Sequence, residues 1–297
     1  MNGVLLGIMF CIVAMGCFAA LYILVARSQK KAADPHGLTL VIFVTGLAAS
    51  LANPLAFLPA MYPPRLLAIG TLIGIAAGIG IFGTTLSARS GAPASVINTV
   101  ASLALCVPVA LAFVFFHQAP NGLQSIGLVL SLLAIALLQA FSHSSPAGAD
   151  PAIPSGPSRR LATAFFMALM FLGNGMAQFL QARLHHEGLD GLQSSALTMM
   201  YLAGTACSVL SLLFFRGRIN SGALRYGLAV GLASVSGNAL ILRALATTPA
   251  SVVFPLIVCG PIVLTVVYAR VIEGARLSPI QAWGLSCGAV AVLMLTL

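Results

Sequence analysis

Ten apolar stretches, each about as long as a bilayer is thick, run through the chain with short polar connections between them. Lipid offers no partner to a free backbone N–H or C=O, so each stretch is predicted to form an α-helix. Only 6% of the residues are charged, against about 25% in soluble domains, which favours an all-α membrane protein. The predicted spans are residues 3–26, 37–59, 65–87, 93–115, 122–141, 161–182, 193–215, 221–243, 249–271 and 278–297.

The two halves of the chain resemble each other, which indicates a duplication. A shift of 156 residues places residues 93–96 on residues 249–252, letter for letter, and a shift of 157 places Gly70 and Gly74 on Gly227 and Gly231. Because each half holds an odd number of spans, the second half must enter the membrane from the opposite side. The sequence therefore predicts two inverted five-helix repeats, an arrangement in which secondary transporters place the substrate site between the repeats.

A polar segment separates the repeats. It covers residues 142–160, is rich in Pro, Ser and Gly and lacks apolar periodicity, so it is predicted to be a flexible linker between repeats 1–141 and 161–297. The first span is preceded by no Lys or Arg and is longer than the apolar region of a signal peptide, so we expect it to be retained.

The Lys and Arg residues fall unequally on the two sides of this arrangement. Eleven of the fourteen lie in or beside the loops after odd-numbered spans, and the other side has only Arg65, Arg183 and Arg243. Cytoplasmic loops carry the excess of positive charge, so both termini are predicted to lie outside. The net charge of +9 is attributed to this orientation rather than to nucleic-acid binding, because the residues form no continuous basic stripe.

The sequence lacks the residues that ATP binding, metal binding and proton-coupled export of cations usually require. The sequence has no phosphate-binding G-x-x-x-x-G-K-[ST] loop, and its six cysteines form no C-x-x-C pair, so neither ATP nor a metal or other cofactor is expected. A proton-coupled exporter of organic cations would need an acidic residue within the membrane. All five carboxylates instead lie in or beside loops: Asp34, Asp150, Glu187, Asp190 and Glu273.

Polar side chains inside the spans recur at helical spacing, which places them on shared faces. An unpaired amide in lipid costs several kcal/mol, so these faces are predicted to point toward each other or toward a wet cavity. The stripes are Ser95, Asn98, Thr99, Ser102 and Cys106; Asn174, Gln178 and Gln181; Thr198, Tyr201, Thr205 and Ser208; and Ser234 with Asn238.

Seven residues are the candidates for substrate binding: Tyr22, Asn98, Ser102, Asn174, Gln178, Tyr201 and Asn238. The 156-residue shift places Asn174 and Gln178 on Phe18 and Tyr22, so one half would offer amides where the other offers rings. Such a pocket suits a ligand with one polar end and one apolar or cationic end. The alternative is that the hydroxyls bond to neighbouring helices, at about 0.6 kcal/mol each, and that both rings only pack.

Pro255 and Pro261 interrupt the backbone hydrogen bonding of the ninth span. They flank Cys259 and Gly260, and this makes the span the best candidate for a bend that moves during function.

Residues 246–295 resemble the end of the repeat in the EamA-type drug/metabolite transporter superfamily. Glu273, Gln281, Gly284 and Gly288 stand where that repeat has a glutamate, a short loop and a final helix that opens with Gln and Gly. In the first half, SARSGAPASV matches the corresponding run, but His117 replaces the usual glutamate and the tryptophan common in the first helix is missing.

The resemblance implies a ten-helix carrier of small metabolites that works by alternating access, with many exporters and some importers in the superfamily. It also implies termini inside the cell, which conflicts with the Lys and Arg count. Glu273 could couple protons, but its place at the membrane edge favours a cap or anchor for the last helix.

These observations predict a secondary transporter that moves a small zwitterionic or neutral, amino-acid-like metabolite outward across a bacterial inner membrane. An exporter of drug-like cations and a channel are the alternatives within transport. A membrane-embedded enzyme is not expected, because all five histidines are predicted to lie outside the helix cores. Its expected partners are the substrate and the bilayer, and the oligomeric state is left open, a monomer included.

Overall fold

A computed structural model describes residues 3–31, 33–52, 62–90, 94–117, 121–140, 157–272, 274 and 279–296. Within these residues it holds eleven α-helices, one 3-10 helix and no strand, which confirms the predicted all-α fold. The elements are α1 (Gly3–Lys30), α2 (Pro35–Leu51), α3 (Pro64–Arg89), α4 (Ala94–Leu103), α5 (Cys106–Phe116), α6 (Gly122–Ala140), α7 (Pro157–His186), η4 (Asp190–Leu192), α8 (Gln193–Phe214), α9 (Ser221–Leu245), α10 (Ala250–Val271) and α11 (Pro279–Thr296).

Six of the helical segments in the described part of the chain are long and apolar enough to cross a membrane. This length and composition are those of a multi-pass membrane protein. The segments are Gly3–Ser28, Pro64–Ser87, Leu161–His186, Asp190–Phe214, Ser221–Leu245 and Ala250–Val271.

A break divides the fourth predicted span, residues 93–115, into α4 and α5. Pro108 has no N–H to donate to the carbonyl of Ala104, and its ring crowds that carbonyl, so a continuous helix is lost there. The Val107 N–H instead reaches the Ala104 carbonyl at 3.1 Å, which closes a tighter turn. The prediction of a single helix is therefore wrong for this span.

α7 begins at Pro157, inside the predicted linker of residues 142–160. Proline suits the first turn of a helix, because an N–H at that position has no partner within the helix. Residues 157–160 therefore belong to α7 and not to the linker, whereas residues 142–156 lie outside the described part of the chain.

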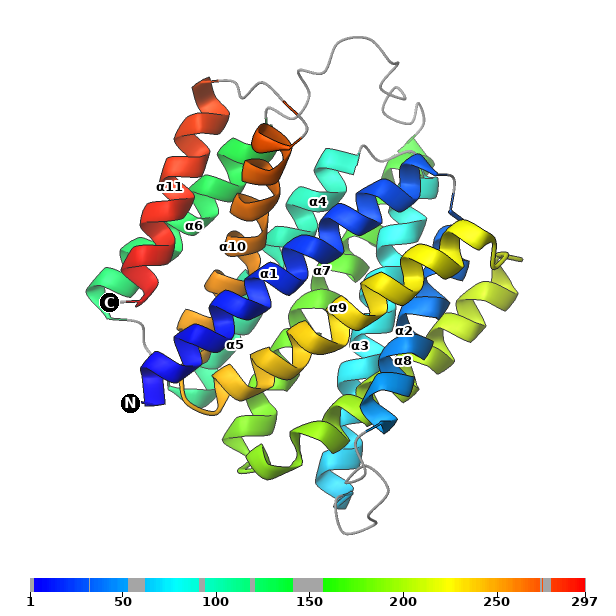
Figure 1. The fold of residues 1–297 in the computed structure, drawn as a ribbon, viewed down its shortest axis with the longest axis horizontal. Helices are drawn as coiled ribbons and strands as arrows, with labels where there is room; N and C mark the ends of the chain where they lie inside the picture. Colours follow the sequence, from blue (N-terminus) through cyan, green and yellow to red (C-terminus); the bar gives the residue numbers. More distant parts are fainter. Residues whose placement is uncertain are drawn as a thin grey trace.

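The helices form two layers with a pair at each edge (Figure 1). α1 packs beside α9 in one layer, and α3 packs beside α7 in the other. α2 and α8 join the layers at one edge, while α6 and α11 pack together at the opposite edge, next to α10. The start of α1 and the end of α11 lie at the same end of the molecule (Figure 1).

Glycines allow close approach at two of these contacts. A Cβ atom on Gly74 of α3 would lie 2.3 Å from the Met200 carbonyl oxygen of α8. A Cβ on Gly231 of α9 would lie 2.6 Å from the Cβ of Thr45 in α2. Gly74 and Gly231, which the 157-residue shift aligns, thus both permit close helix packing. Gly74 does so between α3 and α8, and Gly231 between α9 and α2.

α10 runs through the middle of one apolar cluster. Its residues 250–261 are all buried, and the helix continues through both Pro255 and Pro261 to Val271. Neighbouring helices surround the turns that lost backbone hydrogen bonds, so packing holds the helical path where the sequence alone would permit a break.

Candidate functional site

Four polar side chains form one hydrogen-bonded group where α7, α8 and α9 meet; this polar cluster consists of Gln181, Tyr201, Ser234 and Asn238. Gln181 Nε2 donates to Asn238 Oδ1 at 3.0 Å. Asn238 Nδ2 donates to the Tyr201 hydroxyl at 3.2 Å, and that hydroxyl lies 2.9 Å from Ser234 Oγ. Three helices are therefore joined by one set of hydrogen bonds.

Local sequence explains how the polar cluster assembles. Ser234 and Asn238 are four residues apart, which places them on one face of α9. Tyr201 is only 1% exposed, and its ring meets the Phe43 ring edge-on at a centroid distance of 6.0 Å. Gly46 of α2 provides the space for this ring, since a Cβ there would lie 2.3 Å from Tyr201 Cε1.

The backbone fixes which way the amides of the polar cluster point. The Ser234 carbonyl can only accept a hydrogen bond, and Asn238 Nδ2 donates to it at 2.9 Å. Asn238 Oδ1 must then face Gln181, so Gln181 must present its Nε2 to it. The remaining oxygen, Gln181 Oε1, is left as an acceptor by this chain of assignments.

Two acceptor oxygens on α7 are buried without a hydrogen-bond partner among the described residues, and they belong to Gln178 and Gln181. Gln181 is 5% exposed. Leaving such an acceptor unsatisfied costs about 1–3 kcal/mol, so a donor from outside the chain would be bound favourably here. The partner that these two oxygens lack is an N–H or O–H donor, such as an ammonium, an amide, a hydroxyl or water.

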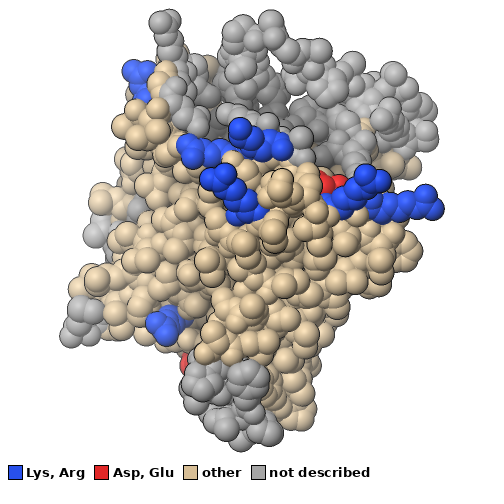
Figure 2. Space-filling model, turned by 45° about the vertical axis from the view of Figure 1, so that its right-hand side comes forward, with Lys and Arg blue, Asp and Glu red and all other residues tan. Residues whose placement is uncertain are grey.

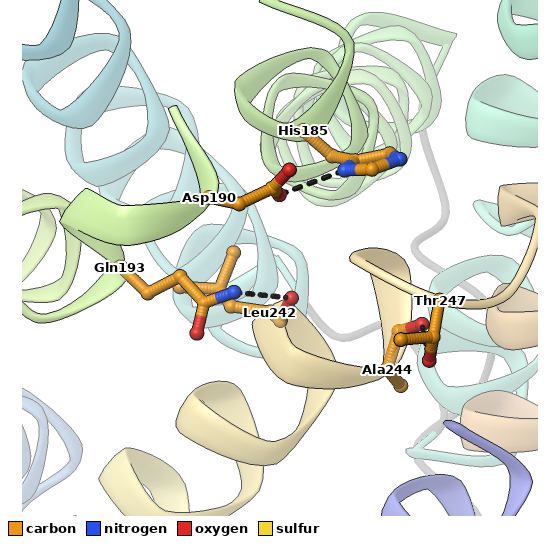
Figure 3. Close-up of polar contacts among 6 residues, drawn as sticks. All are labelled: His185, Asp190, Gln193, Leu242, Ala244 and Thr247. Atoms are coloured by element: carbon orange, nitrogen blue, oxygen red, sulfur yellow. Dashed lines mark hydrogen bonds and ion pairs between the residues drawn. The ribbon is translucent and has the colours of Figure 1, made fainter. Parts of the chain in front are cut away.

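Further polar contacts tie α7, α8 and α9 together beyond the polar cluster (Figure 3). His185 Nδ1 lies 2.7 Å from Asp190 Oδ1, which fixes the turn between α7 and η4. Gln193 Nε2 donates to the Leu242 carbonyl at 3.1 Å and so joins the start of α8 to the last turn of α9. The three helices are thus held together at this end of the molecule.

The structure separates the candidate residues into those that meet and those that do not. Tyr201 and Asn238 share hydrogen bonds, and Gln178 lies one turn from Gln181 on α7. Tyr22 of α1 exposes 46% of its surface, and Ser102 lies partly buried in the last turn of α4. The side chain of Asn98 and the whole of Glu273 lie outside the described residues.

Asn174 packs against a neighbouring helix. Its Oδ1 lies over Gly80 of α3, where a Cβ would come within 2.2 Å of that oxygen. Phe18 of α1 lies in the same way over Gly237 of α9, at 2.9 Å from a Cβ built there. The amide and the ring that the 156-residue shift pairs therefore fill corresponding spaces between helices.

Sequence reasoning placed Gln181 and Ser234 on polar faces but did not select them as site residues. The signal was present, because Gln181 continues the stripe of Asn174 and Gln178, and Ser234 lies one turn before Asn238. The missing information was which helices adjoin, and this decides which stripes meet.

His36 lies at the start of a helix, outside the helix core as the sequence predicts, but its side chain is buried. It sits in the first turn of α2 and is 2% exposed. Its Nδ1 lies 2.8 Å from Ser211 Oγ, and its ring stacks on Phe215 at 4.9 Å. Asp34 accepts hydrogen bonds from the first N–H groups of α2, which draws the histidine into the fold.

No group of three His, Cys, Asp or Glu side chains that could hold a metal ion occurs in the part of the chain that the structure describes. Asp34, Glu187 and Asp190 lie at helix ends, where they cap helices or pair with neighbouring arginine or histidine side chains. The interior around the polar cluster thus offers uncharged hydrogen-bonding groups from the described residues.

Comparison with known proteins shows the fold alone. No protein-family model and no curated protein matches the chain. A solved structure described only as "Crystal structure of protein" is similar, with a TM-score of 0.77 over 98% of each chain and 15% sequence identity. The arrangement of helices is therefore one that an experimentally determined protein also adopts.

Proposed function

We propose that this chain is a secondary transporter of the drug/metabolite type, with ten membrane spans in two inverted repeats, and that it moves an amino-acid-like metabolite by alternating access. In this proposal α4 and α5 together form the fourth span. The observation that carries it is the pair of buried acceptor oxygens of Gln178 and Gln181. Such acceptors select a ligand that brings N–H or O–H donors.

The helix contacts support the inverted repeat. The contact of α3 with α7 corresponds to that of α9 with α1, and the contact of α3 with α8 corresponds to that of α9 with α2. The same correspondence holds for single residues, since the 156- and 157-residue shifts convert the Gly80–Asn174 contact into the Gly237–Phe18 contact. A pseudo-twofold axis between the layers accounts for both.

The two ends of the helix bundle differ, which supports alternating access. α7 packs against α9 beside the polar cluster, whereas the described residues of α1 and α3, the corresponding pair, make no comparable contact. One end is therefore held closed by hydrogen bonds. Opening would exchange the hydrogen bonds between α7 and α9 for contacts with water or substrate.

The chemistry of the interior favours a zwitterionic or neutral substrate over a permanent cation. Gln178 and Gln181 can accept from an ammonium group, but no carboxylate of the described residues lies beside them to neutralise a full positive charge. A substrate that carries its own carboxylate avoids this cost. Amino acids and their amides meet this condition.

Charge placement supports an orientation for the proposed transporter. Figure 2 shows the Lys and Arg side chains in view gathered mainly toward one end of the molecule, with one near the opposite end. With the basic end in the cytoplasm, as in a bacterial inner membrane, both termini face outward and the polar cluster closes the outer end. Export would then require this cluster to open.

A paired-ligand experiment tests the proposal. The purified protein is titrated with common amino acids and with the corresponding carboxylic acids that lack the amine, and thermal unfolding is followed. We expect stabilisation by at least one amino acid and none by its deaminated partner. Gln178→Met should abolish the stabilisation, because it removes a free acceptor and leaves the hydrogen bonds of the polar cluster in place.

Flux measurements complete the test. Proteoliposomes should take up the stabilising amino acid with saturation, and Thr205→Val, whose hydroxyl bonds only within α8, should match the unmodified protein. Flux that never saturates would establish a channel instead. Equal binding of amine and deaminated ligands would contradict the assignment of the two acceptors.

A further inference from the structure

We propose that the protein binds the headgroup of an ethanolamine phospholipid in a pocket on the lipid-facing side of the α3–α7 seam. The pocket has a volume of about 400 Å³. Its lining includes Arg65, Ile69 and Leu72 from α3, and Leu180, Arg183 and Glu187 from α7. It combines charged groups with an apolar wall, as an amphipathic ligand requires.

The charged groups of the pocket form a triad with two cations and one anion. Arg65 Nη1 lies 3.6 Å from one oxygen of Glu187, and Arg183 Nε lies 3.2 Å from the other. Glu187 is 23% exposed at its side chain, while Arg65 and Arg183 are 80% and 50% exposed. Each guanidinium has five N–H donors, so most of them remain available to a phosphate.

The pocket opens toward lipid and not toward the polar cluster. Leu72 of α3 is 49% exposed, and Ile75 and Ile79 extend the same exposed face. On α7, Arg183 follows the exposed Leu172 by eleven residues, about three helical turns, and so shares its face. An acyl chain can therefore lie along the helices while its headgroup reaches the arginines.

The triad lies on the side of the membrane that carries few Lys and Arg residues in the proposed arrangement. Only three of the fourteen Lys and Arg residues lie on this side in the ten-span arrangement, and two of them line this pocket. An arginine at a membrane edge reaches the headgroups by extending its side chain. Here two arginines from different helices converge on one carboxylate, which defines a site rather than two independent contacts.

The triad matches a phosphoethanolamine headgroup in charge. The two guanidinium groups suit the phosphate, and Glu187 suits the ammonium, which can donate hydrogen bonds to it. A phosphocholine headgroup lacks N–H donors, and a phosphoglycerol headgroup lacks the positive charge. Free inorganic phosphate shares the phosphate chemistry but cannot use the apolar wall of Ile69, Leu72 and Leu180.

Native mass spectrometry of the detergent-solubilised protein tests this site. The protein is titrated with phosphatidylethanolamine, phosphatidylcholine and phosphatidylglycerol of identical acyl chains. We expect several-fold tighter binding of the ethanolamine lipid than of the choline lipid. Arg65→Gln with Arg183→Gln should remove this preference, while Arg243→Gln, the third arginine of this side, should leave it intact.

Two further comparisons identify which groups are recognised. Glu187→Gln should bind ethanolamine and glycerol lipids equally, because it removes the charge that attracts the ammonium, together with the two ion pairs to Arg65 and Arg183. Competition by inorganic phosphate equal to that by the lipid would overturn the proposal, as would ethanolamine-lipid binding that survives the double arginine substitution. Thermal unfolding of each variant shows that it is folded, and none of these outcomes depends on transport.

Discussion

The polar cluster, which lies in the second half of the chain, has an apolar counterpart in the first half. The contact of Tyr201 with Gly46 is repeated by the contact of Phe43 with Gly204, which relates α2 to α8 by a shift of 158 residues. The shifts of 156 and 157 relate the remaining cluster members, Gln181, Ser234 and Asn238, to Val25, Ala77 and Ile81. Corresponding positions of the two repeats thus carry hydrogen-bonding side chains in one and apolar side chains in the other.

This difference shows how one architecture can hold its two ends together with different strength. Apolar side chains gain little by leaving lipid-like surroundings for one another, so they do not specify a closed contact. Directional hydrogen bonds do specify such a contact, and α7 packs against α9 at the place where these hydrogen bonds form. The polar cluster is therefore the element whose strength can be changed to bias the two ends.

The largest effect should come from the two glycines that make room for the aromatic rings. In Gly204→Ala the new Cβ would lie 2.2 Å from Phe43 Cε1, and in Gly46→Ala it would lie 2.3 Å from Tyr201 Cε1. Overpacking of this kind costs about 1–3 kcal/mol and occasionally more. Thermal unfolding should show similar losses for both variants, since the two contacts are equivalent.

Gly16→Ala is the control for these substitutions, because a Cβ at Gly16 of α1 meets nothing within 4 Å. It should leave stability unchanged or raise it by about 0.5–1 kcal/mol through helix propensity. A loss at only one of the two ring contacts would break the correspondence between α2 and α8.

Asn238→Leu should have the next largest effect. It should lower the free energy of unfolding by about 1–3 kcal/mol, because it leaves the amide of Gln181 and the hydroxyl of Tyr201 buried without this partner. The counterpart substitution Ile81→Leu conserves volume at the apolar end and should cost less than about 1.5 kcal/mol. Chemical unfolding in detergent compares the two. Equal losses would show that the hydrogen bonds do not distinguish the ends.

Much of the fold follows from the sequence because length and hydropathy decide it. The predicted spans agree with the helices in type, and α10 occupies residues 250–271 against the predicted 249–271. Pro108 was visible in the sequence, yet Pro255 and Pro261 lie inside an unbroken helix. Whether a proline ends a helix depends on the packing around it, which the local sequence does not contain.

The candidate site could be predicted only in part, for a related reason. Periodicity placed Tyr201, Asn238 and Gln178 on polar faces, and two of them belong to the polar cluster. It placed Asn174 on the same face as Gln178, but the glycine at position 80 lets a neighbouring helix come close enough to cover that amide. Helix periodicity determines a face, and the neighbouring helix determines what the face does.

Tyr201→Phe should have a smaller effect, because it removes a single atom. This atom is the hydroxyl oxygen, which the counterpart residue Phe43 lacks. The ring contacts with Phe43 and Gly46 are kept, and the hydrogen bonds to Ser234 and Asn238 are lost. We expect a loss of about 0.5–1.5 kcal/mol. A double-mutant cycle with Asn238→Leu should show coupling, and strict additivity would contradict a shared network.

Thr205→Val should have the smallest effect and separates hydrogen bonds within a helix from those between helices. Thr205 lies one turn after Tyr201, and its hydroxyl donates to the Tyr201 carbonyl of the same helix at 2.7 Å. Its loss leaves the contacts between α7, α8 and α9 in place, so thermal unfolding should change by about 0.6 kcal/mol or less. A loss as large as that of Tyr201→Phe would mean that α8 itself, and not the polar cluster, sets the stability of this end.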